Sequence, residues 1–358
     1  MVAKTQVRPS HWKTIVNQIA DGQCVPFLGA AANVSVEGTY DGLPLGREVA
    51  LRFFEELTGL RNVKPERYDP GKLAGELLQR LNGLASRDPD TVALVEYARP
   101  RLTEIVDIHE SLEPYADLRQ LRMLDLARVA LHMRFENDLP GLLSRLRRLL
   151  PDERRQPSRL LQALATFPIP LIITTNYDNL MERALETRPY RLVVQPPQGF
   201  ADNECWTRLE EDLPAVDDLI LYKIHGSFRD PGDANSTSGV IVTEEDYIQF
   251  LTVVGREIGG IPTYIKSLIQ ESTLLFLGYS LEDWDFRTVF KGLVEVLQPE
   301  MRNRAFAFQK DPPDFWVDFW EKKEVTIYNV DLYEFADELQ ERVADELQKR
   351  VMAGANND

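Results

Sequence analysis

Residues 24–35 have the sequence CVPFLGAAANVS, in which a short apolar run passes directly into a glycine and a row of small side chains. An apolar run that ends in this way predicts a buried strand followed by a tight turn. Small side chains allow the backbone N–H groups of such a turn to approach a phosphate, but they serve close packing equally well. The stretch therefore predicts the first strand of a sheet, and it leaves open whether the turn binds a ligand.

Further apolar runs of the same kind follow along the chain. They are LIITTN (171–176), LILYKIHG (219–226), TLLFLGY (273–279), RAFAF (304–308) and VTIYNV (325–330). Polar turn residues follow each run, and a helical pattern follows most of them. Continuous apolar strands that alternate with helices are typical of a parallel sheet covered on both faces. We therefore predict an α/β fold with a Rossmann-like parallel sheet sandwiched by helices.

The region 51–165 has a different pattern, in which helical periodicity recurs without a convincing strand. Helices are predicted there at 72–82, 118–135, 139–150 and 158–166. We interpret 51–165 as an inserted helical module. The Rossmann-like domain is then discontinuous and comprises residues 1–50 and 166–358.

Two further helices are predicted in the discontinuous domain, at 11–21 and at about 332–352. The last helix has the charge spacing of an exposed face, with pairs such as Glu338 and Arg342 four residues apart. We expect it to pack against its own sheet, and an oligomer contact is the alternative. Its apolar stripe consists of Phe335, Leu339, Val343, Leu347 and Val351.

The charge balance argues against general nucleic-acid binding. The chain has 41 basic and 57 acidic residues and a net charge of −16, which at long range repels a phosphate backbone. A group of arginines is a local exception, and a solvated helical surface is the simpler interpretation of it. The group consists of Arg145, Arg147, Arg148, Arg154, Arg155 and Arg159. We therefore expect no strong nucleic-acid binding by this chain alone.

Cysteine content and hydropathy argue against further classes of protein. With only Cys24 and Cys205, the chain can build neither a disulfide framework nor a cysteine zinc site. Cys24 lies in the first apolar run and is expected to be a core thiol. The polar amino terminus lacks a secretion signal, and no apolar segment reaches membrane-spanning length. We expect a soluble cytoplasmic protein without membrane contact.

Polar residues at the strand ends are candidates for a site, because ligands of open parallel sheets bind at the carboxyl ends of strands. Asn176 and Asp178 could orient a ligand, or they could be turn formers and helix caps. His225 could accept or relay a proton near neutral pH, or it could be a structural histidine bonded to backbone. Gly278 allows close approach of the backbone, and Ser280 can donate a hydrogen bond to a ribose or phosphate.

Six motifs in a fixed order connect these strand ends. They are FLGAAAN (27–33), LPLGRE (43–48), TTNYD (174–178), KIHGS (223–227), VTEEDY (242–247) and LGYSLEDWD (277–285). This order resembles the sirtuin-like domain of bacterial antiphage defence effectors, as do LDLARV (124–129) and FWVDFW (315–320). The resemblance extends from about residue 12 to residue 345. It implies that NAD⁺ binds at the switch point of the sheet, with the insertion forming one wall of the cleft.

The resemblance also implies a role for individual residues. Asn176 matches the catalytic asparagine that positions the nicotinamide ribose or the attacking water, and His225 matches the histidine that contacts the ribose hydroxyls and acts as a base. Asp178 matches the residue that recognises the nicotinamide carboxamide. The other residues implied to contact NAD⁺ are Gly29, Ala30, Ala31, Asn33, Thr175, Gly278 and Ser280. NAD⁺ is the substrate in this chemistry, and no metal is implied.

Two departures from the family pattern affect the prediction. Ala31 stands where a glycine is usual, so we expect weaker phosphate binding or a need for an activating conformational change. The four-cysteine zinc module of deacylating sirtuins is missing. NAD⁺ hydrolysis is therefore favoured over protein deacylation, and a module that senses NAD⁺ or ADP-ribose without cleaving it is the second hypothesis.

The predicted function is an NAD⁺ glycohydrolase effector of antiphage defence, which cleaves NAD⁺ to nicotinamide and ADP-ribose and so depletes cellular NAD⁺. Such an activity has to be restrained before infection. We therefore expect a sensor or regulatory partner protein, a homo-oligomer, or both, because assembly can order the wall of a cleft.

Overall fold

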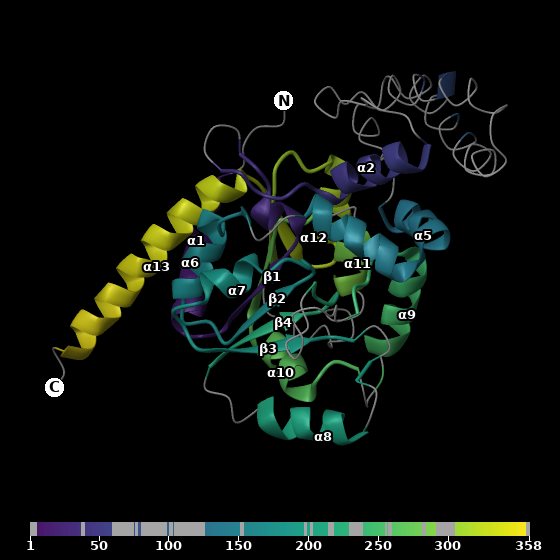
Figure 1. Ribbon diagram of the computed structural model, residues 1–358. Coiled ribbons are helices and arrows are strands. Elements are labelled where there is room, and N and C mark those ends of the chain that lie inside the picture. The colour runs from purple at the N-terminus through teal and green to yellow at the C-terminus, as the bar shows by residue number, and fades with distance from the viewer. Residues whose placement is uncertain are drawn as a thin grey trace.

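The computed structural model describes most of the predicted sheet domain and the two ends of the predicted insertion (Figure 1). The described residues are 6–36, 40–58, 126–150, 154–196, 199–200, 203–213, 218–228, 239–254, 256, 260–280, 284–290 and 305–355, with isolated positions 75, 78, 79, 99 and 103.

A seven-stranded parallel sheet forms the centre of the molecule, in the order β3-β4-β2-β1-β5-β6-β7. The strands are β1 (Cys24–Leu28), β2 (Leu171–Thr174), β3 (Tyr190–Val194), β4 (Leu219–Lys223), β5 (Thr273–Leu277), β6 (Ala305–Gln309) and β7 (Val325–Asn329). The α/β class and the parallel sheet are therefore confirmed, and six strands lie at the predicted apolar runs. The edge strand β3 was not predicted.

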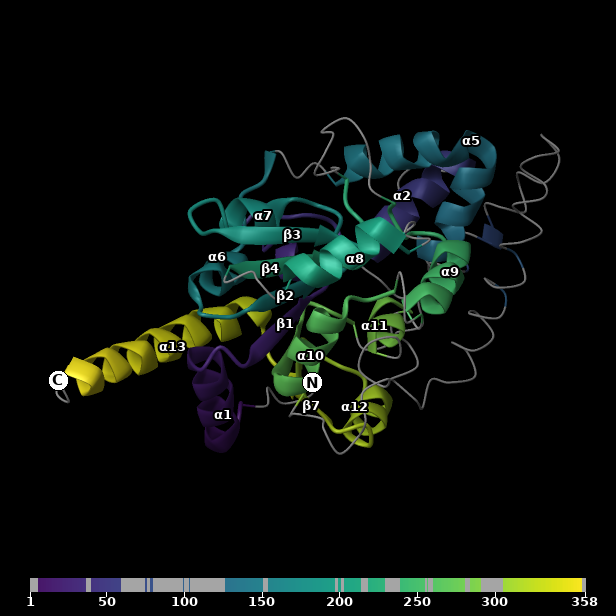
Figure 2. The same cartoon turned by 90° about the horizontal axis from the view of Figure 1, so that it is seen from below.

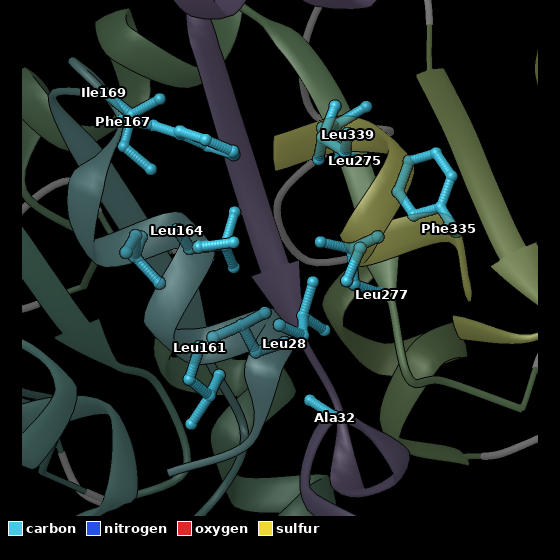
Figure 3. Close-up of a cluster of buried hydrophobic side chains, with 14 of the residues drawn as sticks. Leu28, Ala32, Leu161, Leu164, Phe167, Ile169, Leu275, Leu277, Phe335 and Leu339 are labelled. Carbon is cyan, nitrogen blue, oxygen red and sulfur yellow. The ribbon is translucent and has the colours of Figure 1, made fainter. Parts of the chain in front are cut away.

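Helices cover both faces of the sheet (Figure 2). Successive strand residues alternate between the faces, so that Phe27 lies in one core cluster and Leu28 in the other. The face with Leu28 is covered by α1 (Pro9–Ala20), α6 (Arg159–Thr166), α7 (Leu180–Ala184) and α13 (Leu332–Ala355). Figure 3 shows part of this cluster, where α6 and α13 pack on β1 and β5.

The opposite face is covered by a second group of helices. They are α8 (Asn203–Asp212), α9 (Glu244–Val254), α10 (Thr263–Glu271), α11 (Trp284–Val289) and α12 (Asp314–Glu321). Phe286 of α11 packs edge-on against Phe276 of β5 and Trp320 of α12, with ring centroids 4.9 and 4.7 Å apart. Cys24 is fully buried, which confirms it as a core thiol, and burial raises the pKa of that thiol.

Of the described helices in the predicted insertion, α6 packs on the sheet, and the two others pack chiefly on each other. These two are α2 (Gly46–Thr58) and α5 (Leu126–Leu149), which pack together around a third apolar cluster. Asp138 breaks α5 with a φ of 60°, close to where the sequence predicts one helix to end and the next to begin. No strand occurs among the described residues between 51 and 165. The helix predicted at 72–82, apart from three isolated positions, and the start of the helix predicted at 118–135 lie outside the described residues.

The amphipathic stripe of α13 is only partly buried. Phe335, Leu339 and Val343 are buried as predicted, because this half of the helix packs on α1 and α6. Val351, at the other end of the predicted stripe, is 73% exposed. The helix extends beyond the edge of the domain before it reaches this residue (Figure 1). None of the helices in the described part of the chain is long and apolar enough to cross a membrane.

Several of the clustered arginines pair with acidic residues of the same chain. Arg145 Nε lies 2.5 Å from Glu56 Oε1, and Arg159 pairs with Asp337 at 2.5 Å. Arg155 binds Asp41 and also donates to the Gly42 carbonyl. These contacts favour the interpretation of the cluster as a structural surface.

Tyr222 of β4 makes a buried polar contact with Gln195, the residue after β3, and this contact can be tested. Its hydroxyl donates to Gln195 Oε1 at 2.6 Å, and both residues are fully buried. Tyr222→Phe leaves this oxygen without its donor, so we expect a loss of about 1–3 kcal/mol in the free energy of unfolding at pH 7. Denaturant titration of the two proteins measures this loss.

The same variant has a predicted pH dependence. Burial raises the pKa of the Tyr222 phenol above its ordinary value of 10.0, so the folded state keeps the proton that the unfolded chain releases. The stability from this group is therefore complete below pH 10 and is lost as the pH rises further. Tyr222→Phe should show a shallower decline above pH 10, and an unchanged decline would contradict this assignment.

Candidate functional site

The candidate site lies at the carboxyl ends of β1 and β5, where the strand order reverses. The connection after β1 leads to β2 on one side, whereas the connection after β5 leads to β6 on the other side. Open α/β sheets bind ligands in the crevice at such a switch point. Gly29 follows β1 and Gly278 follows β5, so two of the predicted site residues lie at this crevice.

Both glycines are required by close backbone contacts. Gly278 has a φ of +80°, and a Cβ there would lie 2.3 Å from the Ala32 nitrogen. A Cβ on Gly29 would lie 2.6 Å from the Gly278 carbonyl oxygen. The absence of side chains therefore lets the turn after β1 pack directly on the turn after β5.

The turn after β1 is a short 3₁₀ helix (Ala30–Asn33) whose amides are already partly used. The N–H of Ala31 donates to the Gly278 carbonyl at 2.9 Å, and the N–H of Ala32 donates to the Gly29 carbonyl at 3.0 Å. Both amides therefore have acceptors within the protein in this conformation. Ala30 is exposed and Ala31 is half-buried.

The Leu28 carbonyl, at the end of β1, accepts hydrogen bonds from residues at the ends of β2 and β5. It accepts from the Thr175 N–H at 3.1 Å and from the Thr174 hydroxyl at 3.2 Å. The Tyr279 hydroxyl donates to the same oxygen at 3.1 Å. Thr175, predicted to contact NAD⁺, thus lies at the crevice, and Tyr279 is a neighbour that sequence analysis did not single out.

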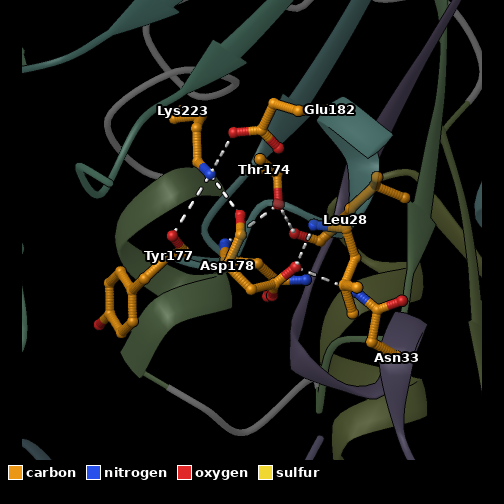
Figure 4. Close-up of polar contacts among 9 residues, drawn as sticks. Leu28, Asn33, Thr174, Tyr177, Asp178, Glu182 and Lys223 are labelled. Atoms are coloured by element: carbon orange, nitrogen blue, oxygen red, sulfur yellow. Dashed lines mark hydrogen bonds and ion pairs between the residues drawn. The ribbon is translucent and has the colours of Figure 1, made fainter. Parts of the chain in front are cut away.

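Asn176, Asp178 and Asn33 converge beside this junction. Figure 4 shows Asp178 and Asn33 side by side. The Asn176 side-chain amide donates to the Gly29 carbonyl at 3.1 Å, and Asn176 is half-buried. Asp178 Oδ1 accepts from the Leu180 N–H at 2.9 Å and lies 3.5 Å from Asn33 Nδ2. The structure therefore brings together three residues that are predicted to contact NAD⁺ and that come from two different loops.

Asp178 forms a turn contact, whereas Asn33 has an acceptor that a ligand could use. The bond from Leu180 to Asp178 is the turn contact considered from the sequence. Asn33 is 2% exposed, and its Oδ1 has no hydrogen-bond partner among the described residues. A buried acceptor without a donor is costly unless a ligand supplies one.

Tyr40 belongs to the loop beside Asp178. Burial, followed by the negative charge of Asp178, raises the pKa of the Tyr40 phenol to about 12. Its hydroxyl donates to the Gln156 carbonyl at 2.8 Å, and the Tyr333 hydroxyl donates to the Val34 carbonyl at 2.8 Å. These bonds fix the loop that follows the 3₁₀ turn.

A cavity of about 540 Å³ lies along this loop, between it and the helices α2 and α5. Its lining includes Leu43, Glu48, Arg52 and Arg148, and none of the predicted site residues. The cavity is therefore distinct from the crevice at the strand ends.

His225 lies two residues beyond β4 and is fully buried. Its ring packs edge-on against Tyr247 and Phe250 of α9, with centroids 5.4 and 5.1 Å away. The ring is therefore enclosed by aromatic side chains. Ser280, at the other side of the site, is half-buried after β5.

Lys223 and Glu182 are two charged residues of the site region that sequence analysis missed. Lys223 ends β4 and is fully buried, and its Nζ lies 2.8 Å from Glu182 Oε1. A lysine at the end of an otherwise apolar strand was the available signal. Among the described residues, no group of three or more His, Cys, Asp or Glu side chains is arranged to hold a metal ion.

Comparison with known protein families identifies the central part of the chain. Residues 170–328, which contain β2 to β6 and most of β7, match the family model described as a SIR2-like domain. The chain carries a SIR2-like domain. The predicted sirtuin-like family is therefore confirmed, and the matched range includes Asn176, Asp178, His225 and Gly278.

Curated relatives of this SIR2-like chain are similar at low identity. The protein named NAD(+) hydrolase ThsA from Enterococcus faecium is 27% identical over 207 residues, which cover 57% of this chain and 40% of that protein. The protein of the same name from Bacillus cereus (strain MSX-D12) is 24% identical over 53% of this chain and 37% of its own length. Defense-associated sirtuin 2 from Bacillus subtilis is 28% identical over 39% of this chain and 12% of that protein.

The SIR2-like chain thus spans less than half the length of these relatives. A solved structure described as a SIR2 homolog–NAD complex aligns with 97% of this chain and 98% of its own at 11% identity, with a TM-score of 0.37. The names of the relatives connect this kind of domain with NAD and with defence.

Proposed function

We propose that the SIR2-like domain hydrolyses NAD⁺ to nicotinamide and ADP-ribose, as an effector that depletes NAD⁺ during antiphage defence. The observation that carries the proposal is the convergence of Asn33, Asn176 and Asp178 beside the crevice between β1 and β5. The name NAD(+) hydrolase, carried by relatives at 24% and 27% identity, supports the reaction class, and the name Defense-associated sirtuin 2, of a relative at 28%, supports the role in defence.

The reaction requires positioning more than strong acid–base chemistry. Water attacks the anomeric carbon of the nicotinamide ribose, and the bond to the ring nitrogen breaks with its electron pair leaving on nicotinamide. The proton of the water passes to a base or to solvent. The nicotinamide of NAD⁺ is already a cationic leaving group, so holding ribose and water in line supplies much of the acceleration.

Each residue of the cluster has a proposed part in this reaction. The half-buried Asn176 carboxamide orients the water or the ribose beside Gly29. Asp178 and Asn33 together offer an acceptor and a donor, and the unpartnered Oδ1 of Asn33 offers a second acceptor. This set matches the hydrogen-bonding groups of a carboxamide, which has one acceptor and two donors.

His225 cannot reach a ligand in this conformation, because its ring is fully buried. As a base it would have to contact the ribose hydroxyls, and a fully buried ring that packs on Tyr247 and Phe250 can do so only if the packing around it changes. We therefore propose that cleavage depends on a change in the packing of α9 against the end of β4, driven by a sensor partner or by assembly of several copies.

The enclosed His225 also favours a second candidate function. A module that binds NAD⁺ or ADP-ribose without cleaving it needs the crevice but no base.

The deciding experiment measures NAD⁺ loss and nicotinamide release by chromatography. The protein is assayed alone and with co-purifying partners, beside the Asn176→Ala and His225→Ala variants. Turnover that both substitutions abolish supports the hydrolase. Stoichiometric binding with NAD⁺ recovered intact in every state would overturn it in favour of the sensing module, and acetyl-ADP-ribose formed from acetylated peptides would indicate a deacylase.

A further inference from the structure

Lys223 places a positive charge in the interior directly beneath the candidate site (Figure 4). Its Nζ donates to Glu182 Oε1 at 2.8 Å, to the Tyr177 carbonyl at 3.4 Å and to the Asp178 carbonyl. An ammonium group has three hydrogens to donate, and these three acceptors match them in number. The side chain thus joins the end of β4 to both α7 and the loop between β2 and α7.

This ion pair is poorly suited to a purely stabilising role. Lys223 is fully buried and the Glu182 side chain is 14% exposed, so both charges lose much of their hydration. Glu182 Oε2 is buried with no hydrogen-bond partner within the described part of the chain. Buried ion pairs of this kind often contribute no more to stability than apolar side chains of similar volume. The role of Lys223 therefore lies in its contacts with the two loop carbonyls more than in the stability of the ion pair.

The two carbonyls belong to the residues that directly follow Asn176. Fixing the peptide groups at Tyr177 and Asp178 fixes the direction in which the Asn176 and Asp178 side chains leave the backbone. Those side chains make the contacts with Gly29 and Asn33 that form the candidate site. An error of about 1 Å in the position of a reacting group can lower a rate about 100-fold.

We propose that Lys223, held by Glu182, is a positioning residue that orients the Asn176–Asp178 loop for catalysis. The catalytic consequence rests on the proposed hydrolase, whereas the orientation of the loop does not. The loop has a second attachment, because the Phe228 N–H donates to the Tyr177 carbonyl at 3.1 Å and the Tyr177 hydroxyl donates to the Ile241 carbonyl at 2.5 Å. Removal of the lysine should therefore make the orientation of the loop less fixed, while the contacts with Phe228 and Ile241 keep the loop in place.

Kinetics of three variants test the proposal. Lys223→Met keeps most of the length of the side chain but removes its donors, and we expect kcat to fall about 10- to 100-fold with KM changed less than about threefold. Glu182→Gln keeps an acceptor for Nζ and both carbonyl contacts, so its loss should be clearly smaller. The double variant Lys223→Met/Glu182→Gln buries no unpaired charge, and it should melt near the wild type while its kcat stays as low as that of Lys223→Met.

The control removes an exposed ion pair that joins α6 to α13. Arg159→Met breaks the exposed contact with Asp337, and kcat should stay within about twofold of the wild type. A double variant that regains wild-type kcat would overturn the proposal, because Lys223 would then act only through stability. A loss confined to KM would also overturn it.

A second readout is independent of turnover. Amide hydrogen exchange in residues 176–180 should be faster in Lys223→Met and in the double variant than in the wild type and Arg159→Met. If the wild-type protein hydrolyses no NAD⁺ in any state, the proposed function fails and this measurement alone decides the role of Lys223. Unchanged exchange in these residues would overturn it.

Discussion

Replacing Asn176 with alanine is expected to lower the rate of NAD⁺ cleavage by about 10²–10³-fold while the chain remains folded. Its carboxamide is half-buried and donates to the Gly29 carbonyl at 3.1 Å, directly at the switch point of the sheet. A group fixed there can hold water or ribose in line with the breaking bond, and alanine cannot. The net loss of one hydrogen bond costs only about 1 kcal/mol of stability, so folding should persist.

Initial rates of nicotinamide release, compared with melting temperatures, measure the two effects separately. Asn137→Ala is the matched control, because the Asn137 amide also donates to a backbone carbonyl, that of Met133 at 3.2 Å, but lies on α5. We expect this control to keep its rate within about twofold. Equal losses in both variants would show that Asn176 acts through general stability, and Asn176→Ala with full activity would remove it from the mechanism.

The fold was predictable because most of its strands are buried on both faces. The runs at β1, β2, β4 and β5 are almost wholly apolar, and such runs are typical of the centre of a parallel sheet. The edge strand β3 has the sequence YRLVV, and only Val193 in it is buried. Because an edge strand contacts the core through few side chains, its sequence lacks the continuous apolar pattern.

The composition of the site was predictable, but its contacts were not. Asn176, Asp178 and His225 lie at strand ends because parallel strands end at one edge of the sheet. The pairing of Lys223 with Glu182 joins residues 41 positions apart, and a sequence pattern contains no information on such a contact. The enclosure of His225 is of the same kind, since it depends on how α9 packs against the end of β4.

Gly278→Ala is expected to destabilise the protein by about 2–6 kcal/mol, the largest effect on stability of any substitution considered for the site. Two costs add in this variant. An alanine at a φ of +80° is strained, and its Cβ would lie 2.3 Å from the Ala32 nitrogen and 2.9 Å from the Ala31 carbonyl carbon. Both neighbours are backbone atoms of the turn after β1, so relief of the contact must displace that turn.

Displacement of the turn should lower both the stability of the protein and its affinity for a ligand. The Ala31 N–H and the Gly278 carbonyl hold the two turns together at 2.9 Å, and a methyl group between them separates β1 from β5 where NAD⁺ is proposed to bind. Denaturant unfolding and calorimetric titration with NAD⁺ should therefore show a joint loss of stability and affinity. Gly46→Ala is the control, because its Cβ would make only an ordinary contact at 3.5 Å with Leu126, and we expect a change of less than about 1 kcal/mol. A Gly278→Ala protein as stable as this control would mean that the turns after β1 and β5 separate at little cost, and the crevice would then be adaptable rather than preformed.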